Sequence, residues 1–592
     1  MAQAAQPVLR RGYDSSTGMG ATENVLARVE ASTQAVAAIG ARLRSNKLVL
    51  KALKAWKRGD VPQAAKHSLA ATEADEGNAQ AFQLLAITLH KLGHLHKALV
   101  TYERAYSLDP DDTDLLLNLG LTAWNLDLLE GAERMFRLFI EKRPEHPAGY
   151  NNLGSVLRDR GSLSEAIETL RGAICRMPNE PMLWNTLATA LAEEGRAEES
   201  LVFYQEALRL DPKFARVWHN LGYAYAHLGR LEDAVDAYDA ALALAPDAHE
   251  RIETKHSRSV CLIGLGRLEE GFKEYEIRNA PEFRASILHY TKAPLWRGED
   301  LEGKRVLMVG EQGLGDEFMF ATVIPDIARA VGDEGKLQLA VDPRLVALFQ
   351  RSFPAAEVGT YQDGKLDEKP VRVFHWARKD GDPDFYMPIG TPLYLVRKRL
   401  EDFPRETYLT ADAETTAGFR ARLSALGAGP YVGICWRSMV LAAKRAKYYS
   451  AIEAWRPILS LPGVTFVNLQ YGAVASEIAL AREKFGLTIH NFDDLNLKDD
   501  IDRAAALTAA CDLVISAPTA AAALAGALGV ETWFVVAGRG WPQLGTDHYP
   551  WYRKTRVFAP EQFADWQALM PRVRQALERF RLGGDMTVPR CA

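Results

Sequence analysis

The pattern of apolar and polar positions changes near the middle of the chain. Up to Phe283 the pattern repeats every 34 residues, whereas after Phe283 short apolar runs alternate with helical stretches. The first pattern predicts stacked helical hairpins, because a fixed period of this length is typical of repeat proteins. The second predicts an α/β fold with parallel sheets.

Several residue types mark the 34-residue register. Small residues fall where a first helix would end and where two helices would meet, and a proline falls where a second helix would stop. The markers are Gly59, Gly93, Gly161, Gly195 and Gly229 with Asp127 at the skipped step, Ala98, Ala132, Ala166 and Ala234, and Pro110, Pro144, Pro178, Pro212 and Pro246. The pattern resembles the tetratricopeptide repeat. It predicts an α solenoid of six to seven repeats over 46–283, preceded by a tail over 1–45 with a helix starting near Thr22.

Asparagines recur at one position of the first helix of the repeats. They are Asn118, Asn152 and Asn220. An amide side chain can donate to and accept from an extended peptide at once. O-GlcNAc transferases grip acceptor polypeptides with a similar asparagine ladder, so the three residues are candidate acceptor-binding residues. The alternative is that asparagine is simply common at this position, in which case the repeats indicate protein binding without naming a partner.

In the second half, apolar runs predict two sets of strands. The first set comprises RVLMVG and LQLAVD (304–342), and the second comprises YVGICW, VTFVNLQ, LTIHNF, DLVISAPT and ETWFVVAG (431–538). Helical stretches lie between the runs, which indicates parallel sheets covered on both faces. We expect two Rossmann-like lobes, over 295–425 and 426–592.

A glycine loop follows the first strand of this half. Its glycines, Gly313 and Gly315, fit neither a dinucleotide fingerprint nor a P-loop. The segments GEQGLGDEFMFATVIPDI (310–327), GICWRS (433–438), DLVISAPTAAAALAGALGVETWFV (512–535) and WYRKTRVF (551–558) resemble those of GT-B glycosyltransferases related to the ADP-heptose heptosyltransferases. Tetratricopeptide repeats followed by such a domain resemble bacterial protein glycosyltransferases, in particular flagellin glycosyltransferases. The resemblance implies a flagellin acceptor, a CMP-linked nonulosonic acid such as pseudaminic acid as donor, and neither metal nor further cofactor.

The resemblance also implies roles for individual residues. Asp316 corresponds to the proposed base that takes the acceptor proton, with Glu311 and Glu317 as alternatives; the simpler interpretation of Asp316 is a helix N-cap. The donor would contact residues that follow the strands: Gly313, Gly315, Arg437, Ser438, Lys444, Arg445, Gln470, Pro518, Thr519 and Ala520, with Gln470 and Trp541 beside the nucleotide base. The family commonly has aspartate where Pro518 stands and histidine where Ala523 stands, so an ADP-heptose donor is in doubt.

Composition excludes several classes of function. The 71 Lys and Arg residues against 76 Asp and Glu residues give a net charge of −5, which argues against binding to a nucleic-acid backbone. The sequence has no apolar run long enough for a membrane span and no signal peptide, and its five scattered cysteines suit the cytoplasm. Two alternatives stay open. One is a transferase that uses UDP-GlcNAc or an ADP-heptose donor, and the other is a non-catalytic scaffold or chaperone with a degenerate transferase domain.

Overall fold

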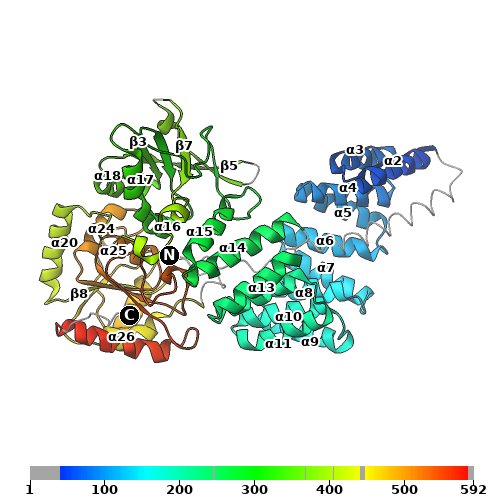
Figure 1. Cartoon of the computed structure of the whole chain (residues 1–592). Coiled ribbons are helices and arrows are strands. Elements are labelled where there is room, and N and C mark those ends of the chain that lie inside the picture. Colours follow the sequence, from blue (N-terminus) through cyan, green and yellow to red (C-terminus); the bar gives the residue numbers. More distant parts are fainter. Residues whose placement is uncertain are drawn as a thin grey trace. The chain divides into compact units, whose positions relative to one another are not determined.

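The chain forms two compact units, one ending at Ala224 and the other beginning at Tyr225. Figure 1 shows that the chain is helical from α2 to α15 and that the large sheets come later in the sequence. The computed structural model describes residues 40–244, 247–366, 369–379, 381–404, 406–439 and 447–583. The helix expected near Thr22 and the marker Pro246 lie outside these residues. The sequence boundary between the units falls inside a helix, whereas the repeat pattern runs on to residue 283.

The first unit consists of antiparallel helical hairpins. Each hairpin packs against the next, so that α2 contacts both α3 and α4. The helices are α2 (Gly40–Lys57), α3 (Val61–Ala74), α4 (Ala79–Lys91), α5 (Leu95–Leu108), α6 (Thr113–Asn125), α7 (Leu129–Lys142), α8 (Pro147–Asp159), α9 (Leu163–Arg176), α10 (Pro181–Glu194), α11 (Ala197–Leu210) and α12 (Ala215–His227), which continues into the second unit. The first helix begins at Gly40, ahead of the predicted boundary at residue 46.

The glycine markers lie at the turns within the hairpins. Gly93 and Gly161 both have φ of 82°, in the left-handed region that glycine enters without a steric penalty. Asp127, at the step without glycine, takes the same conformation with φ of 63°. The marker alanines Ala98, Ala132 and Ala166 are fully buried between helices. The predicted tetratricopeptide repeats are therefore confirmed.

The second unit begins with the last repeat helices. These are α13 (Leu231–Leu244), α14 (Ala248–Gly264) and α15 (Leu268–Tyr275), followed by the short 3-10 helix η1 (Glu276–Asn279). Helix α14 packs against η7 (Trp541–Gln543), and α15 packs against α19 (Leu393–Val396). Within this unit, the last repeat hairpin is thus joined directly to the α/β part.

The first sheet is parallel and has the strand order β4-β3-β2-β7. Its strands are β2 (Arg305–Val309), β3 (Lys336–Val341), β4 (Glu357–Thr360) and β7 (Phe385–Pro388). The helices between them are α16 (Leu314–Phe320), η2 (Ala321–Val323), α17 (Ile324–Val331), η3 (Pro343–Leu345), α18 (Val346–Ser352) and η4 (His375–Arg378). The expected long helix after the glycine loop is thus divided, with Pro325 at the start of α17.

The second sheet is also parallel, with the order β12-β11-β10-β8-β9. Its strands are β8 (Tyr431–Cys435), β9 (Thr465–Asn468), β10 (Leu513–Ser516), β11 (Glu531–Val535) and β12 (Thr555–Phe558). The accompanying helices are η5 (Leu400–Asp402), α20 (Ala413–Leu426), η6 (Ile452–Trp455), α22 (Arg456–Leu459), α23 (Ala475–Phe485), α24 (Ile501–Ala509), α25 (Ala520–Ala527) and α26 (Trp566–Arg581). Helix α20 packs against α24 of this second set, although the expected lobe boundary groups α20 with the first. The α/β class with parallel sheets is confirmed.

Two details differ from the expectation. The run LTIHNF was predicted to be a strand, which is wrong: only His490 forms an isolated bridge, to Val467. A small third sheet, β1-β6-β5, was not expected. Its strands are β1 (Leu288–His289), β5 (Gln362–Leu366) and β6 (Lys369–Val373), and all five residues of β5 are exposed, so no apolar alternation marks it.

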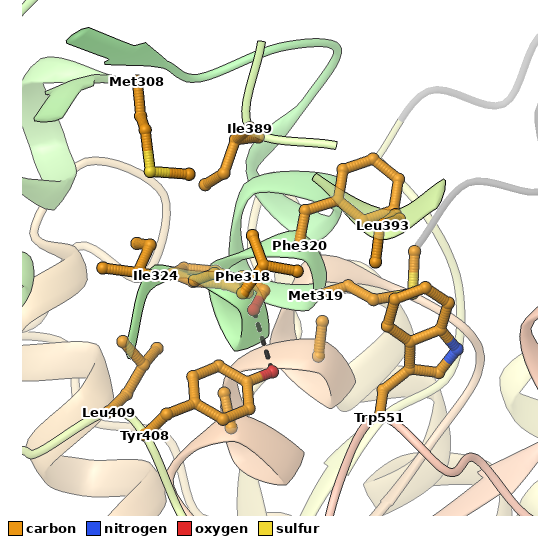
Figure 2. Packing of buried hydrophobic residues seen from close by; sticks show 14 of the residues in the cluster. Met308, Phe318, Met319, Phe320, Ile324, Ile389, Leu393, Tyr408, Leu409 and Trp551 are labelled. Carbon is orange, nitrogen blue, oxygen red and sulfur yellow. Dashed lines mark hydrogen bonds between the residues drawn. The ribbon is translucent and has the colours of Figure 1, made fainter. Parts of the chain in front are cut away.

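One apolar core joins the two large sheets through α16 and α25, which contact each other. Figure 2 shows Phe320 of α16 near Trp551, with ring centroids 5.9 Å apart, and the Tyr408 hydroxyl donating to the Phe318 carbonyl oxygen at 2.9 Å. The loop before α16 and the loop before α25 are thereby attached to the same core. No helix among the described residues has the length and apolar character needed to cross a bilayer.

Candidate functional site

The glycine loop connects the carboxyl end of β2 to α16. Gly313 is the N-cap of α16, in extended conformation (φ −127°, ψ 171°), and it is exposed, whereas Gly315 is buried inside the helix. A Cβ atom on Gly310 would lie 2.5 Å from the Glu317 carboxylate. Position 310 therefore has no room for a side chain, because the buried Glu317 carboxylate lies against it.

Three carboxylates belong to this loop and its helix, and they differ in exposure. Glu311 is 4% exposed and Glu317 is fully buried, whereas Asp316 is half-buried in the first turn of α16. Burial raises the pKa of Glu317 to about 7, although the Tyr361 hydroxyl donates to its Oε1 at 2.7 Å and opposes that rise. Of the three candidate bases, Asp316 is the one that a substrate could reach.

Asp316 lies close to two buried tyrosines. Burial raises the pKa of Tyr275, from the last repeat hairpin, and of Tyr552, which follows β11, and the negative charge of Asp316 adds to both increases. Tyr552 in turn packs on α25, where a Cβ on Gly526 would be 2.6 Å from its ring. Asp316 therefore lies near elements from the repeats, the first sheet and the second sheet.

A second group of polar residues lies where the second sheet changes direction. In its strand order, the chain continues from β8 outward on both sides, to β9 and to β10, and ligands bind at such switch points outside the carboxyl ends of strands. Five side chains gather there, which we term the switch-point cluster: Cys435, Arg437, Gln470, Ser516 and Thr519.

Hydrogen bonds hold the switch-point cluster together. Gln470 Oε1 accepts from the Arg437 backbone N–H at 2.9 Å and lies 3.4 Å from Cys435 Sγ. Thr519 Oγ1 lies 3.4 Å from Cys435 Sγ and 3.3 Å from Ser516 Oγ. Four of the five residues are buried and Arg437 is half-buried, and burial raises the pKa of the Cys435 thiol. The polar atoms of the cluster are bonded to one another, so the cluster fixes the loops that follow β8, β9 and β10.

Arg437 is half-buried and its guanidinium is paired. Its Nε lies 3.0 Å from both carboxylate oxygens of Glu477, and its Nη1 donates to the Ser438 carbonyl oxygen at 3.2 Å. The Ser438 side chain forms a hydrogen bond with Tyr471. Burial raises the pKa of Tyr471, and this hydrogen bond opposes the rise. Any anion that reaches Arg437 would share it with Glu477.

Thr519 occupies the N-cap position of α25, but its side chain makes no capping hydrogen bond. The Thr519 hydroxyl points into the cluster, and the first helical bond runs from Ala523 N to Thr519 O at 3.1 Å. The N–H groups of the helix start are therefore not used within the helix, and with the helix dipole they favour a negative ligand. Pro518 is buried and Ala520 is half-buried at the same turn.

Ala523, which replaces the expected histidine, is fully buried in the core shared with α16. Its small side chain therefore serves the close packing of α25. Trp541 is likewise part of this core: its ring lies 6.2 Å from that of Tyr275 and 6.0 Å from that of Trp551. Lys444 and Arg445 lie outside the described residues. No group of three or more potential metal ligands occurs within the ranges that the structure describes.

The asparagines of the repeats lie below the surface. Asn118, Asn152 and Asn220 are 6%, 8% and 2% exposed. Asn220 Nδ2 donates to Asn185 Oδ1 at 3.0 Å, which links two successive repeats, while Asn118 Nδ2 is buried without a hydrogen-bond partner among the described residues. A peptide would reach these amides only through their narrow exposed edges.

Several residues around the glycine loop carry no sequence signal. Arg372 of β6 stacks over the Tyr361 ring at 3.8 Å and donates to the Gly310 carbonyl oxygen, and its Nη2 lies 3.4 Å from the Gln312 carbonyl oxygen. Arg278 of η1 pairs with Glu311. Both belong to short elements, a five-residue strand and a four-residue 3-10 helix, where neither period nor motif distinguishes a functional arginine from a surface one.

The repeats match known families. Four tetratricopeptide-repeat models match residues 79–112, 117–181, 188–229 and 215–248. Among solved structures, a TPR protein of Thermus thermophilus is 25% identical with a TM-score of 0.28, covering 30% of this chain and 98% of its own. A tetratricopeptide repeat protein of Parabacteroides merdae is 17% identical with a TM-score of 0.33, covering 43% of this chain and 99% of its own.

One curated protein resembles nearly the whole chain. Protein FlbA of Caulobacter vibrioides is 37% identical over 539 residues, which are 90% of each chain. The similarity extends well beyond the repeats into the α/β part that carries the glycine loop and the switch-point cluster. The chain therefore belongs to the family of Protein FlbA.

Proposed function

We propose that this protein is a protein O-glycosyltransferase of the GT-B class that needs no metal. The repeats bind an acceptor protein, and the α/β part transfers a sugar from a nucleotide donor to a serine or threonine. Flagellin is the proposed acceptor, and a CMP-activated nonulosonic acid such as pseudaminic acid is the proposed donor.

The observation that carries the proposal is the switch-point cluster at the start of α25. The helix start supplies unused N–H groups and a partial positive charge, which suit the phosphate of a leaving nucleotide. Arg437 lies beside it and adds a cation whose position Glu477 fixes. Gln470 fixes the backbone of Arg437 from below.

Asp316 is the proposed base. It is half-buried, whereas the other two carboxylates at the glycine loop are buried, and it is attached through α16 to the same core as α25. A carboxylate there accepts the proton of the acceptor hydroxyl as the sugar is transferred. Neither Glu311 nor Glu317 can do so without first leaving its buried partners.

The acceptor proposal rests on the repeats and on the family. Tetratricopeptide arrays bind proteins, and this chain shares 37% identity with Protein FlbA. The likeness to flagellin glycosyltransferases makes flagellin the first acceptor to test.

The test is intact-mass spectrometry of flagellin incubated with the protein and CMP-pseudaminic acid. We expect a mass increase equal to one or more sugar residues. Asp316→Asn keeps the size of the side chain but removes the base, so the rate should fall by about 10²- to 10⁴-fold. The matched control is Asp333→Asn, an exposed aspartate in the turn between α17 and β3, which should transfer sugar at the wild-type rate.

Other outcomes identify the alternatives. A mass increase only with UDP-GlcNAc or an ADP-heptose would replace the donor and keep the enzyme class. Binding of flagellin without transfer from any of these donors would contradict the enzymatic proposal and indicate a scaffold or chaperone. Wild-type transfer by Asp316→Asn would rule out Asp316 as the base.

A further inference from the structure

The last repeat hairpin holds the glycine loop through a buried ion pair. Arg278, in η1 directly after α15, has only 3% of its side chain exposed. Its Nε and Nη2 donate to Glu311 Oε2 and Oε1 at 2.8 and 2.9 Å, a bidentate arrangement that fixes both the distance and the orientation of the two groups. Its third nitrogen, Nη1, donates to Glu276 Oε1 at 2.5 Å, which fixes the guanidinium to its own segment.

The next residue of the loop is held by the same hairpin. Gln312 has φ of 58°, an unfavourable value for a residue with a side chain, and its Nε2 donates to the Tyr275 hydroxyl at 2.9 Å. Tyr275 ends α15, and the Arg278 guanidinium lies over its ring at 4.6 Å. Residues 275 and 278 thus contact the two loop residues that precede Gly313.

The ion pair has no space in which to rearrange. Glu311 Oε1 also accepts from the Gly390 N–H at 2.7 Å. A Cβ on Gly390 would lie 2.6 Å from Glu311 Oε1 and 2.9 Å from Arg278 Nη2. The pair is therefore enclosed between Gly390, which follows β7, and η1. A substitution at Arg278 should for this reason alter the position of Glu311 and of the loop that contains it.

We propose that Arg278 is a positioning residue that fixes the glycine loop, and with it Asp316, from the end of the repeat region. This inference rests on the proposed function for its catalytic consequence, but the positioning itself is a property of the fold. Because the Arg278 side chain is buried and paired with Glu311 and Glu276, it acts in this proposal through the loop and not by contact with donor or acceptor. Its loss should therefore change how fast sugar is transferred and leave the binding of the nucleotide at the switch-point cluster unchanged.

The experiment compares Arg278→Met, Arg278→Lys and Glu311→Gln with wild type in the full-length protein. We expect Arg278→Met to lower kcat by about 10- to 100-fold, while the Kd for CMP, measured by calorimetry, stays within about twofold of wild type. Arg278→Lys keeps the charge without the planar fork, so it should recover only part of kcat. Hydrogen exchange of the amides of residues 310–317 should accelerate in Arg278→Met.

The control is Arg329→Met, an exposed arginine on α17, which should alter neither kcat nor exchange in the loop. Unchanged exchange at 310–317 in Arg278→Met would overturn the inference, and so would faster exchange with wild-type kcat. If wild type transfers no sugar, the proposed function fails, whereas the exchange comparison still decides whether Arg278 fixes the loop. If Arg278→Met does not fold, Arg278→Lys and Glu311→Gln provide the same comparison, because each keeps a polar group in the buried position.

Discussion

At the scale of single residues, the glycines at the turns within the hairpins allow backbone strain to be measured apart from side-chain packing. Gly161 has φ of 82° and no atom within 4 Å of where a Cβ would be, so only backbone strain opposes a side chain there. Gly161→Ala should lower the free energy of unfolding by about 1–2 kcal/mol. Urea denaturation followed by circular dichroism would measure it.

The matched control lies on the following helix. Gly172 is an exposed position of α9 with ordinary helical backbone, and it too has open space around it. Gly172→Ala should raise the free energy of unfolding by about 0.5–1 kcal/mol, because alanine is the better helix former. Equal effects of the two substitutions would contradict the role assigned to the left-handed turn.

Glu317 makes stability depend on pH in an unusual direction for a carboxyl group. Its folded-state pKa is raised to about 7 from an unfolded value of 4.5, so the native state binds the proton more tightly. This contribution is fully present below pH 4.5 and is lost as the pH rises through 7. Wild type should therefore lose up to ~3 kcal/mol relative to Glu317→Gln between pH 4.5 and 7. Urea denaturation of both proteins across this range measures the difference, and parallel pH profiles would show that the carboxyl group titrates normally.

What the sequence predicts about the site differs from residue to residue. Asp316 and Thr519 stand in motifs with glycine or a strand end, so both could be identified. Arg278, Arg372 and Tyr361 lie in or beside short elements far away in sequence, and only the fold brings them to the loop. No sequence pattern indicates that Glu477 pairs with Arg437, because the two are 40 positions apart and on different elements.

At the scale of elements, polar side chains connect the first helices of successive repeats in a regular way. His90, Trp124 and Arg158 occupy one position of the 34-residue register, and their partners occupy the next position one repeat later. The pairs are His90–Asn125 at 3.2 Å, Trp124–Asp159 at 2.9 Å and Arg158–Glu193 at 3.7 Å. Each pair fixes the register between two hairpins that apolar packing alone would leave free to slide.

Removing one of these pairs should destabilise the repeats. Trp124→Phe takes away the N–H that donates to a buried aspartate, so it should lower the free energy of unfolding by about 1.5–3 kcal/mol. The control is Trp184→Phe, because Trp184 donates to the exposed Pro178 carbonyl oxygen, which water can satisfy. A comparable loss in both variants, measured by urea denaturation, would show that the size of the indole matters rather than its hydrogen bond.

The elements themselves were predicted where their pattern is strong. The 34-residue period predicts the hairpins, and buried apolar runs predict β2, β3 and β8 to β11. The third sheet escaped prediction because β1 has two residues and β5 is polar and exposed. The run LTIHNF has the composition of a strand but forms a single bridge, since the apolar side chains of such a run can be buried without a continuous ladder.

At the scale of the whole molecule, the two compact units should unfold separately. The boundary at Ala224 and Tyr225 assigns α13 to α15 to the α/β part, although their sequence is that of repeats. Calorimetry should show two transitions. CMP at 100 times its Kd should stabilise only the unit that starts at Tyr225, by about 2.7 kcal/mol. Gly161→Ala should lower the free energy of unfolding only of the unit that ends at Ala224. A single transition that responds to both changes would contradict this division.

The contact between the last repeat hairpin and the α/β part also covers the end of the repeat array. Such arrays need a terminal cap with a polar outer face to remain in solution. Here Leu268, Phe272 and Tyr275 of α15 are buried in the same core as Phe318 and Trp551, so the α/β part itself is the cap. A fragment cut after residue 283 would expose this apolar face and stick to unrelated proteins. Proteins captured with such a fragment would therefore bind the apolar face that truncation exposes and not the natural binding surface of the repeats.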